Sequence, residues 1–182
     1  MGIDSEDGGG NGGTRSVASV IVLVLRSNRL PVRKNLPHFP PVDRHNTAII
    51  LFVTVCTKQR KQVLANDATH QLLCAAWATQ PAWLVGRYVI MPDHVHFFCA
   101  PADLDTAALK PWVRFWKSHV AKNWNDPTQL PIWQRDFWDT QLRKGENYDE
   151  KWQYVLENPV RAGLVKHSED WPYQGELNVL EW

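Results

Sequence analysis

The sequence predicts an α+β domain in which helices cover one face of an antiparallel sheet. Apolar runs of strand length alternate with stretches of helical composition, in the order strand, helix, strand, strand, helix, strand. This order is that of the split βαβ, or ferredoxin-like, arrangement. A further helix follows the last predicted strand, and a capping pattern marks its start.

The predicted elements follow one another closely from residue 48. Strands are expected over 48–56, 84–90, 94–100 and 132–138, and helices over 67–80 and 110–124. The first helix has Asp67 as a candidate N-cap, and the second tolerates Pro111 in its first turn. The short turn Met91-Pro92-Asp93 separates two strands, which predicts a hairpin.

The C-terminal helix is expected over 147–158. Asn147 and Glu150 have capping-box spacing, and Pro159 disfavours helix at the residue before it. At about 100° per residue, Tyr154 falls opposite the apolar stripe of this helix, and Asn158 lies one turn later. A core tyrosine is the usual alternative, but it would bury the polar face of the helix.

The chain before the domain has a different composition. Residues 1–14 are Gly-rich and acidic, and residues 26–44 contain four prolines, so we expect 1–45 to be a disordered or poorly structured leader. One domain should then occupy 46–182. The apolar run 17–25 is too short to span a bilayer. Three widely spaced cysteines suit a reducing cytoplasm better than a disulfide framework.

Charge gives only a weak indication of a partner. The net charge is +1, so no overall basic character demands nucleic acid. Lys58, Arg60 and Lys61 follow the first predicted strand, and they could contact phosphates, as could Lys117 in the second helix. A solvated loop is the alternative interpretation of the cluster.

The pair His94 and His96 stands at the start of a predicted strand. Side chains alternate along a strand, so both imidazoles should share one face while Val95 and Phe97 share the other. Two imidazoles at this spacing can bind one divalent cation. A His-x-His pair alone is weak evidence, but its place inside an apolar run strengthens the hypothesis.

Tyr154 and Asn158 could complete such a site. A phenolate can attack phosphorus and form a phosphotyrosine, and a metal can polarise the attacked phosphate. The amide oxygen of Asn158 would be a neutral metal ligand one turn from the nucleophile. Tyr148 competes poorly because it belongs to the apolar stripe.

Three ordered segments resemble a known family. The stretch 88–96, YVIMPDHVH, resembles the histidine-hydrophobe-histidine (HUH) motif of single-tyrosine transposases. The segments 131–138, PIWQRDFW, and 154–165, YVLENPVRAGLV, resemble the REP-associated tyrosine transposases, which are relatives of transposases of very small insertion sequences. The resemblance covers roughly residues 46–173, and the combination is more specific than any one motif.

The resemblance implies a ferredoxin-like fold, Mg²⁺ or Mn²⁺, and single-stranded DNA bearing a palindromic hairpin. It implies cleavage that leaves a 5′-phosphotyrosine and a free 3′-OH, and a cytoplasmic, nucleoid-associated protein that is a monomer or homodimer. By matching position, His94 and His96 would bind the metal with Asn158 as third ligand, and Tyr154 would be the nucleophile.

Other functions remain as alternatives. A domesticated hairpin-binding protein without strand transfer fits the same resemblance, although all four proposed active-site residues are present. A histidine-triad protein would need histidine where Phe98 stands, and a two-histidine phosphoesterase would need a repeated His-x-Thr/Ser motif that is absent. A zinc hydrolase is weakly supported, because no third histidine or carboxylate follows at short ligand spacing.

Overall fold

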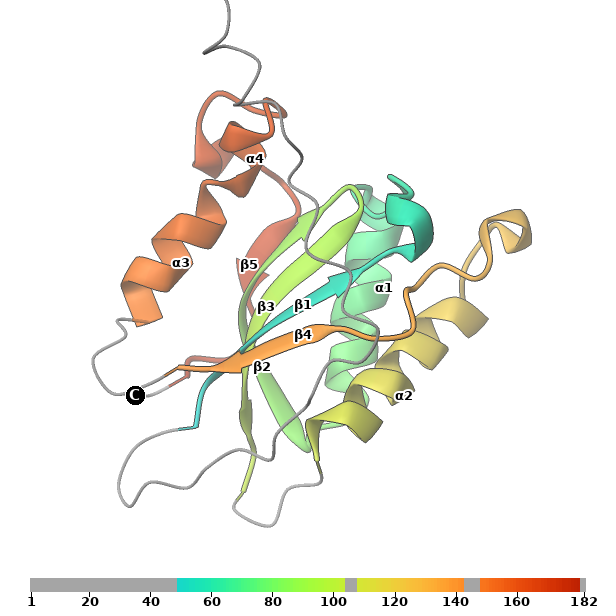
Figure 1. Ribbon diagram of the computed structural model, residues 1–182, viewed down its shortest axis with the longest axis horizontal. Coiled ribbons are helices and arrows are strands. Elements are labelled where there is room, and N and C mark those ends of the chain that lie inside the picture. The colour runs from blue at the N-terminus through green and yellow to red at the C-terminus, as the bar shows by residue number, and fades with distance from the viewer. Residues whose placement is uncertain (1–48, 104–107, 143–147, 181–182) are drawn as a thin grey trace, which may run out of the picture. The chain divides into compact units, whose positions relative to one another are not determined.

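A computed structural model describes residues 49–103, 108–142 and 148–180 of the chain. The predicted leader over 1–45, the apolar run 17–25 and the candidate cap Asn147 lie outside these ranges. Within them, the protein is a mixed α+β structure with one antiparallel sheet (Figure 1).

The sheet has five strands in the order β4-β1-β3-β2-β5, and each neighbouring pair is antiparallel. The strands are β1 (Leu51–Cys56), β2 (Trp83–Met91), β3 (His94–Pro101), β4 (Trp138–Gln141) and β5 (Gln174–Glu176). The predicted antiparallel sheet is confirmed. The fifth strand was not predicted, because three residues are too few to show a period-2 pattern.

In the described part of the chain, four α-helices accompany the sheet: α1 (Asp67–Ala78), α2 (Leu109–Lys122), α3 (Tyr148–Leu156) and α4 (Asn158–Arg161). The same part contains three short 3₁₀ turns, η3 (Lys58–Arg60), η4 (Pro127–Gln129) and η5 (Ser168–Asp170). No helix of the described ranges combines the length and apolar character needed to cross a membrane.

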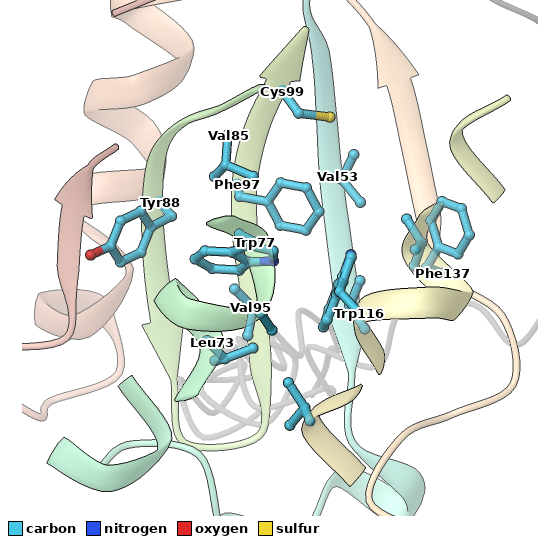
Figure 2. Close-up of a cluster of buried hydrophobic side chains, with 14 of the residues drawn as sticks. Val53, Leu73, Trp77, Val85, Tyr88, Val95, Phe97, Cys99, Trp116 and Phe137 are labelled. Atoms are coloured by element: carbon cyan, nitrogen blue, oxygen red, sulfur yellow. The ribbon is translucent and has the colours of Figure 1, made fainter. Parts of the chain in front are cut away.

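The two faces of the sheet carry different helices. Helices α1 and α2 lie on one side of the sheet and α3 on the other (Figure 1). The α1/α2 side holds the larger core, in which the ring of Phe97 lies 5.5–6.0 Å, between centroids, from those of Trp77, Trp112 and Trp116. Figure 2 shows Phe97 beside Trp77 and Trp116. The smaller core, on the α3 side, contains Phe98 and the buried stripe of α3. Aromatic packing therefore explains most of the tryptophan content.

Two of the predictions for the segments before the C-terminal helix were wrong. Residues 132–137 do not form a regular strand: Trp133 makes an isolated bridge to Thr57, and the strand begins only at Trp138. Ile132 and Phe137 are apolar because they fill the larger core. The N-cap of α1 is Asn66, whose side chain accepts a hydrogen bond from the Thr69 backbone N–H.

The C-terminal helix ends earlier than predicted. Helix α3 stops at Leu156, and α4 begins at Asn158. Pro159 has no N–H to continue the α3 ladder, and it occupies the first turn of a new helix instead. Gly163, at φ 69°, follows α4 in the left-handed conformation that commonly ends a helix.

Candidate active site

The hairpin of β2 and β3 places the histidine pair on the α3 side of the sheet. His94 begins β3, and alternation directs Val95, Phe97 and Cys99 into the larger core with no exposed surface. The two histidines therefore share the opposite face, as the sequence predicts. β3 is the middle strand of the five, so rigid neighbours on both sides hold this face.

The two imidazoles converge on one point. Their Nε2 atoms lie 3.0 Å apart. Each Nδ1 atom has its own partner: Asp93 Oδ1 lies 2.6 Å from that of His94, and Thr54 Oγ1 lies 2.8 Å from that of His96. The carboxylate accepts from the Nδ1–H of His94, which leaves the Nε2 of His94 with a lone pair that faces His96.

Burial favours the neutral form of His96. Burial lowers the pKa of His96 well below its usual value, and the positive charges of Arg60, Lys151 and Arg161 lower it further. Burial raises the pKa of Asp93, but the His94 hydrogen bond and the nearby Arg60 outweigh it and leave that pKa below its usual value. His96 is thus available as a neutral ligand, beside a carboxylate that stays ionised.

Tyr154 stands on the open side of α3. Its side chain is 62% exposed, whereas Tyr148 and Val155 of the same helix are buried. This confirms that Tyr154 lies off the apolar stripe. A tyrosine this open contributes little to the core and is accessible to a large substrate.

Arg161 ties Tyr154 to Asn158. Its guanidinium carbon lies 4.2 Å from the centre of the Tyr154 ring, which is a cation–π contact. The same guanidinium donates hydrogen bonds to the Tyr154 carbonyl and to Oδ1 of Asn158. Arg161 lies one turn after Asn158 within α4, and from there it also reaches the last part of α3.

Two side chains connect α3 to the histidines. The Lys151 ammonium lies 5.2 Å from the centre of the Phe52 ring, and that ring stacks on His96 with centroids 5.3 Å apart. The charge of Arg161 also acts on His96. The structure thus forms two groups, the imidazole pair on β3 and the Tyr154–Asn158–Arg161 group on α3 and α4, with Phe52 and Lys151 between them.

The basic residues considered for DNA contact have diverse surroundings. Arg60 pairs with Asp93 at 2.6 Å and donates to Sγ of Cys56 at 2.8 Å, so it supports the histidine site. Lys58 is exposed in η3, and Lys61 reaches the Gln129 carbonyl at 3.5 Å. Lys117 is not at the surface: it is 9% exposed, and its ammonium donates to two backbone carbonyls.

Sequence reasoning did not identify three residues that the geometry places at the site: Thr54, Asp93 and Arg161. Asp93 adjoins His94, and Arg161 follows Asn158 by three residues, so their spacing could have suggested both. Thr54 could not be found this way, because only the register of β1 against β3, which pairs it with His96, brings it there.

Comparison with known proteins gives two curated relatives. The REP-associated tyrosine transposase of Escherichia coli K12 is 28% identical over 90 residues, 49% of this chain and 52% of that protein. A Haemophilus influenzae Rd protein, which carries the same name with a provisional qualifier, is 29% identical over 96 residues, 46% of this chain and 53% of that protein. The chain spans about half the length of the curated relatives it matches.

One solved structure has a similar fold. It is described as a REP-associated tyrosine transposase bound to a REP hairpin, and it matches with a TM-score of 0.58 and 23% identity, covering 75% of this chain and 82% of its own. No protein-family profile matches the sequence.

The curated relatives make this chain similar to transposases. Among transposases it is similar to the REP-associated tyrosine transposases, which confirms the family resemblance that the sequence motifs indicated.

Proposed function

We propose that this protein is a single-tyrosine HUH transposase that cleaves and rejoins single-stranded DNA with the help of a divalent metal. The observation that carries the proposal is the convergence of two imidazoles with their Nε2 atoms 3.0 Å apart, together with the charge of Arg161 acting on His96 while Arg161 contacts the exposed Tyr154 and Asn158. The order β1-α1-β2-β3-α2-β4 and the sheet order β4-β1-β3-β2 support the ferredoxin-like assignment.

The histidine pair fits a divalent metal. Ligands at about 2.1 Å and a right angle to each other in an octahedral shell lie about 3 Å apart, and the two Nε2 atoms have this separation. Their Nδ1 partners, Asp93 and Thr54, resemble the outer hydrogen bonds that orient metal-binding histidines. The phosphate chemistry favours Mg²⁺ or Mn²⁺ as the ion that these residues would hold.

Asn158 is the third ligand we propose. Among the described residues, no cluster of three or more His, Cys, Asp or Glu side chains could hold a metal ion. The Asn158 amide offers an oxygen, which here accepts from Arg161, while its buried nitrogen has no partner. A buried amide nitrogen without a hydrogen-bond partner destabilises this side-chain conformation. The Asn158 side chain therefore loses little if it rotates to direct its oxygen to a metal.

Each side chain then has a role in the transfer. When bound, the metal supplies a positive charge that polarises the scissile phosphate. The Tyr154 hydroxyl gives up its proton and its oxygen forms a bond to phosphorus, while the bond from phosphorus to the 3′ oxygen breaks and the released 3′ oxygen takes up a proton. The product is a 5′-phosphotyrosine with a free 3′-OH, and attack by a 3′-OH reverses the step. Arg161 holds the ring of Tyr154 in place and can stabilise negative charge on the phosphate.

The substrate we propose is single-stranded DNA with a palindromic hairpin. The similar structure contains a REP hairpin, and both curated relatives carry the REP-associated name. A hairpin presents a duplex stem beside an unpaired strand, and an exposed tyrosine can reach the backbone of an unpaired strand. Hairpin sequences from DNA that flanks the gene are the natural probes.

The test replaces the nucleophile. Wild-type protein incubated with a labelled single-stranded hairpin and Mn²⁺ should form an adduct that survives denaturing electrophoresis. Tyr154→Phe removes only the attacking oxygen from an exposed ring, so it should abolish the adduct and preserve DNA affinity and thermal stability.

Tyr148→Phe is the matched control. Tyr148 is buried edge-on against Phe98, at 4.8 Å between ring centroids, and its hydroxyl has no hydrogen-bond partner. Its variant should therefore react like the wild type. If Tyr154→Phe formed the adduct and Tyr148→Phe did not, the nucleophile would be Tyr148 and the assignment of Tyr154 would be wrong. Hairpin binding by the wild type without any adduct would favour the non-cleaving hairpin-binding alternative.

A further inference from the structure

A cationic pocket lies beside the edge strand β4, away from the histidine pair. It has a volume of about 270 Å³ and is formed by one face of α2 and the segment that leads into β4. Helix α2 contributes Lys110, Arg114 and Lys117, whose spacing places them on one side of the helix. The segment before β4 contributes Arg135 and Asp136. We call this the α2–β4 pocket.

Lys117 gives the pocket its fixed shape. Its ammonium donates to the carbonyls of Gln134 at 2.6 Å and Arg135 at 3.2 Å, which holds the segment before β4 against α2. An ammonium has three N–H donors, so a third can serve a ligand. Burial lowers the pKa of Lys117 to about 8, partly offset by Asp136, so a bound anion would favour its charged form.

The rest of the pocket carries positive charge that is not neutralised. Lys110, Arg114 and Arg135 are exposed. Within the described ranges, none of these three side chains forms an ion pair. Asp136 is the one carboxylate that lines the pocket, against four cations. An anion with several acceptor oxygens would satisfy this arrangement, and guanidinium groups match phosphate oxygens well.

The pocket and the histidine pair lie toward the same end of the sheet. Trp138, the first residue of β4, is paired with Thr54 of β1, and Thr54 is in turn paired with His96 of β3. Neighbouring strands are about 4.8 Å apart, so β4 lies about 10 Å from β3 across the sheet. Because Arg135 and Asp136 immediately precede β4, a nucleic-acid strand leaving the histidine pair over this edge would meet the pocket.

We propose that the α2–β4 pocket binds a backbone phosphate of the single-stranded DNA that is cleaved at the histidine pair. The proposal rests on the proposed function and adds a second contact point for the same strand. Arg114 and Arg135 would donate hydrogen bonds to the phosphate oxygens. Lys110 would add positive charge at the rim of the pocket, and the buried Lys117 would contribute its third N–H. Such a contact is independent of base sequence and fixes the path of the strand across the β4 edge.

The test measures the salt dependence of DNA binding. Arg114→Ala and Arg135→Ala are substitutions of exposed side chains, so both variants should fold. The probe is a fluorescent single-stranded hairpin with an unpaired extension, taken from DNA flanking the gene. Each variant should bind it roughly 3- to 10-fold more weakly, and the slope of log K against log salt should lose about 0.7 for each phosphate contact removed. Lys122→Ala, exposed at the far end of the same helix, is the control and should match the wild type.

The outcomes separate this inference from the proposed function. If the wild type forms the Tyr154 adduct while both arginine variants bind with wild-type affinity and slope, the pocket inference is wrong and the function stands. If the wild type binds no hairpin, the function fails and the inference with it. Inorganic phosphate, added at constant ionic strength, should displace the hairpin from the wild type no better than from Arg114→Ala. Stronger competition in the wild type than in Arg114→Ala would assign the pocket to free phosphate instead.

Discussion

The two faces of β3 have opposite chemical character. On the α1/α2 face, Val95, Phe97 and Cys99 are fully buried in an apolar core. On the α3 face, His94 and His96 turn the same strand into a polar site whose nitrogen atoms all have partners. Neighbouring residues of this strand therefore have different roles: one stabilises the fold, and the next is a proposed metal ligand.

The difference shows how a β-strand can support a polar site at little cost to the fold. Buried polar groups are tolerated when they are hydrogen-bonded, and each imidazole here has a partner on each ring nitrogen. The strand itself is held by the opposite core. Substitutions on the two faces should therefore affect different measurements.

The largest effect on stability should come from the apolar face. Phe97→Ala removes a ring that packs among three tryptophans, so it should lower the free energy of unfolding by about 3–5 kcal/mol. His96→Ala, at the preceding residue, should lower the free energy of unfolding far less, but it should abolish Mn²⁺ binding and adduct formation. Urea unfolding and Mn²⁺ titration of both variants measure these effects. Equal losses of stability would show that the histidine face is structural.

Lys117 of α2 is a charged residue on the α1/α2 side of the sheet, and its burial predicts that stability depends on pH. It is the one charged residue that is buried in the described ranges. Its pKa of about 8 lies below the 10.5 of an unperturbed lysine because burial disfavours the charge. Between these values the unfolded chain binds more protons than the folded protein, so Lys117 should make stability rise as pH increases from about 8 to about 10.5.

The contribution of Lys117 is the difference in free energy of unfolding between the wild type and a variant without this lysine. By linkage, that difference should change by about 3 kcal/mol between pH 8 and pH 10.5. Lys117→Met removes the titrating group, so the wild type should gain stability relative to the variant as pH rises. Urea unfolding at several pH values measures both, and other titrating groups cancel in the difference. A difference that stays constant from pH 7 to pH 10 would contradict the buried charge.

The sequence predicted the parts of this comparison that depend on local patterns. The period-2 alternation of β3 predicted which face the histidines take, and the 3.6-residue period predicted that Tyr154 would lie off the buried stripe. Both follow from geometry within one element. The short turn at 91–93 likewise predicted the β2–β3 hairpin.

The sequence could not predict contacts between elements. Residues 132–137 have strand-like composition, but Ile132 and Phe137 are apolar because of the core they fill. Lys117 fell on a predicted helix without any sign that its ammonium would be buried. Thr54 became part of the site only through the pairing of β1 with β3, which no local pattern encodes. These features depend on the tertiary packing, which overrides local preference.

Thr54 also gives the smallest and most specific prediction. Its hydroxyl can donate to Nδ1 of His96 or accept from it, so it allows the His96 tautomer to change when Nε2 binds a metal. Thr54→Val keeps the shape and removes the hydroxyl. A lone neutral hydrogen bond contributes about 1 kcal/mol, so Mn²⁺ affinity should fall roughly fivefold, with little change in the fold.

Thr54→Ser keeps the hydroxyl and should bind Mn²⁺ nearly as tightly as the wild type. Electron paramagnetic resonance of free Mn²⁺ measures the dissociation constant directly, without DNA. If the serine and valine variants lose affinity equally, packing of the threonine methyl orients His96, and the hydroxyl has no part in preparing the site.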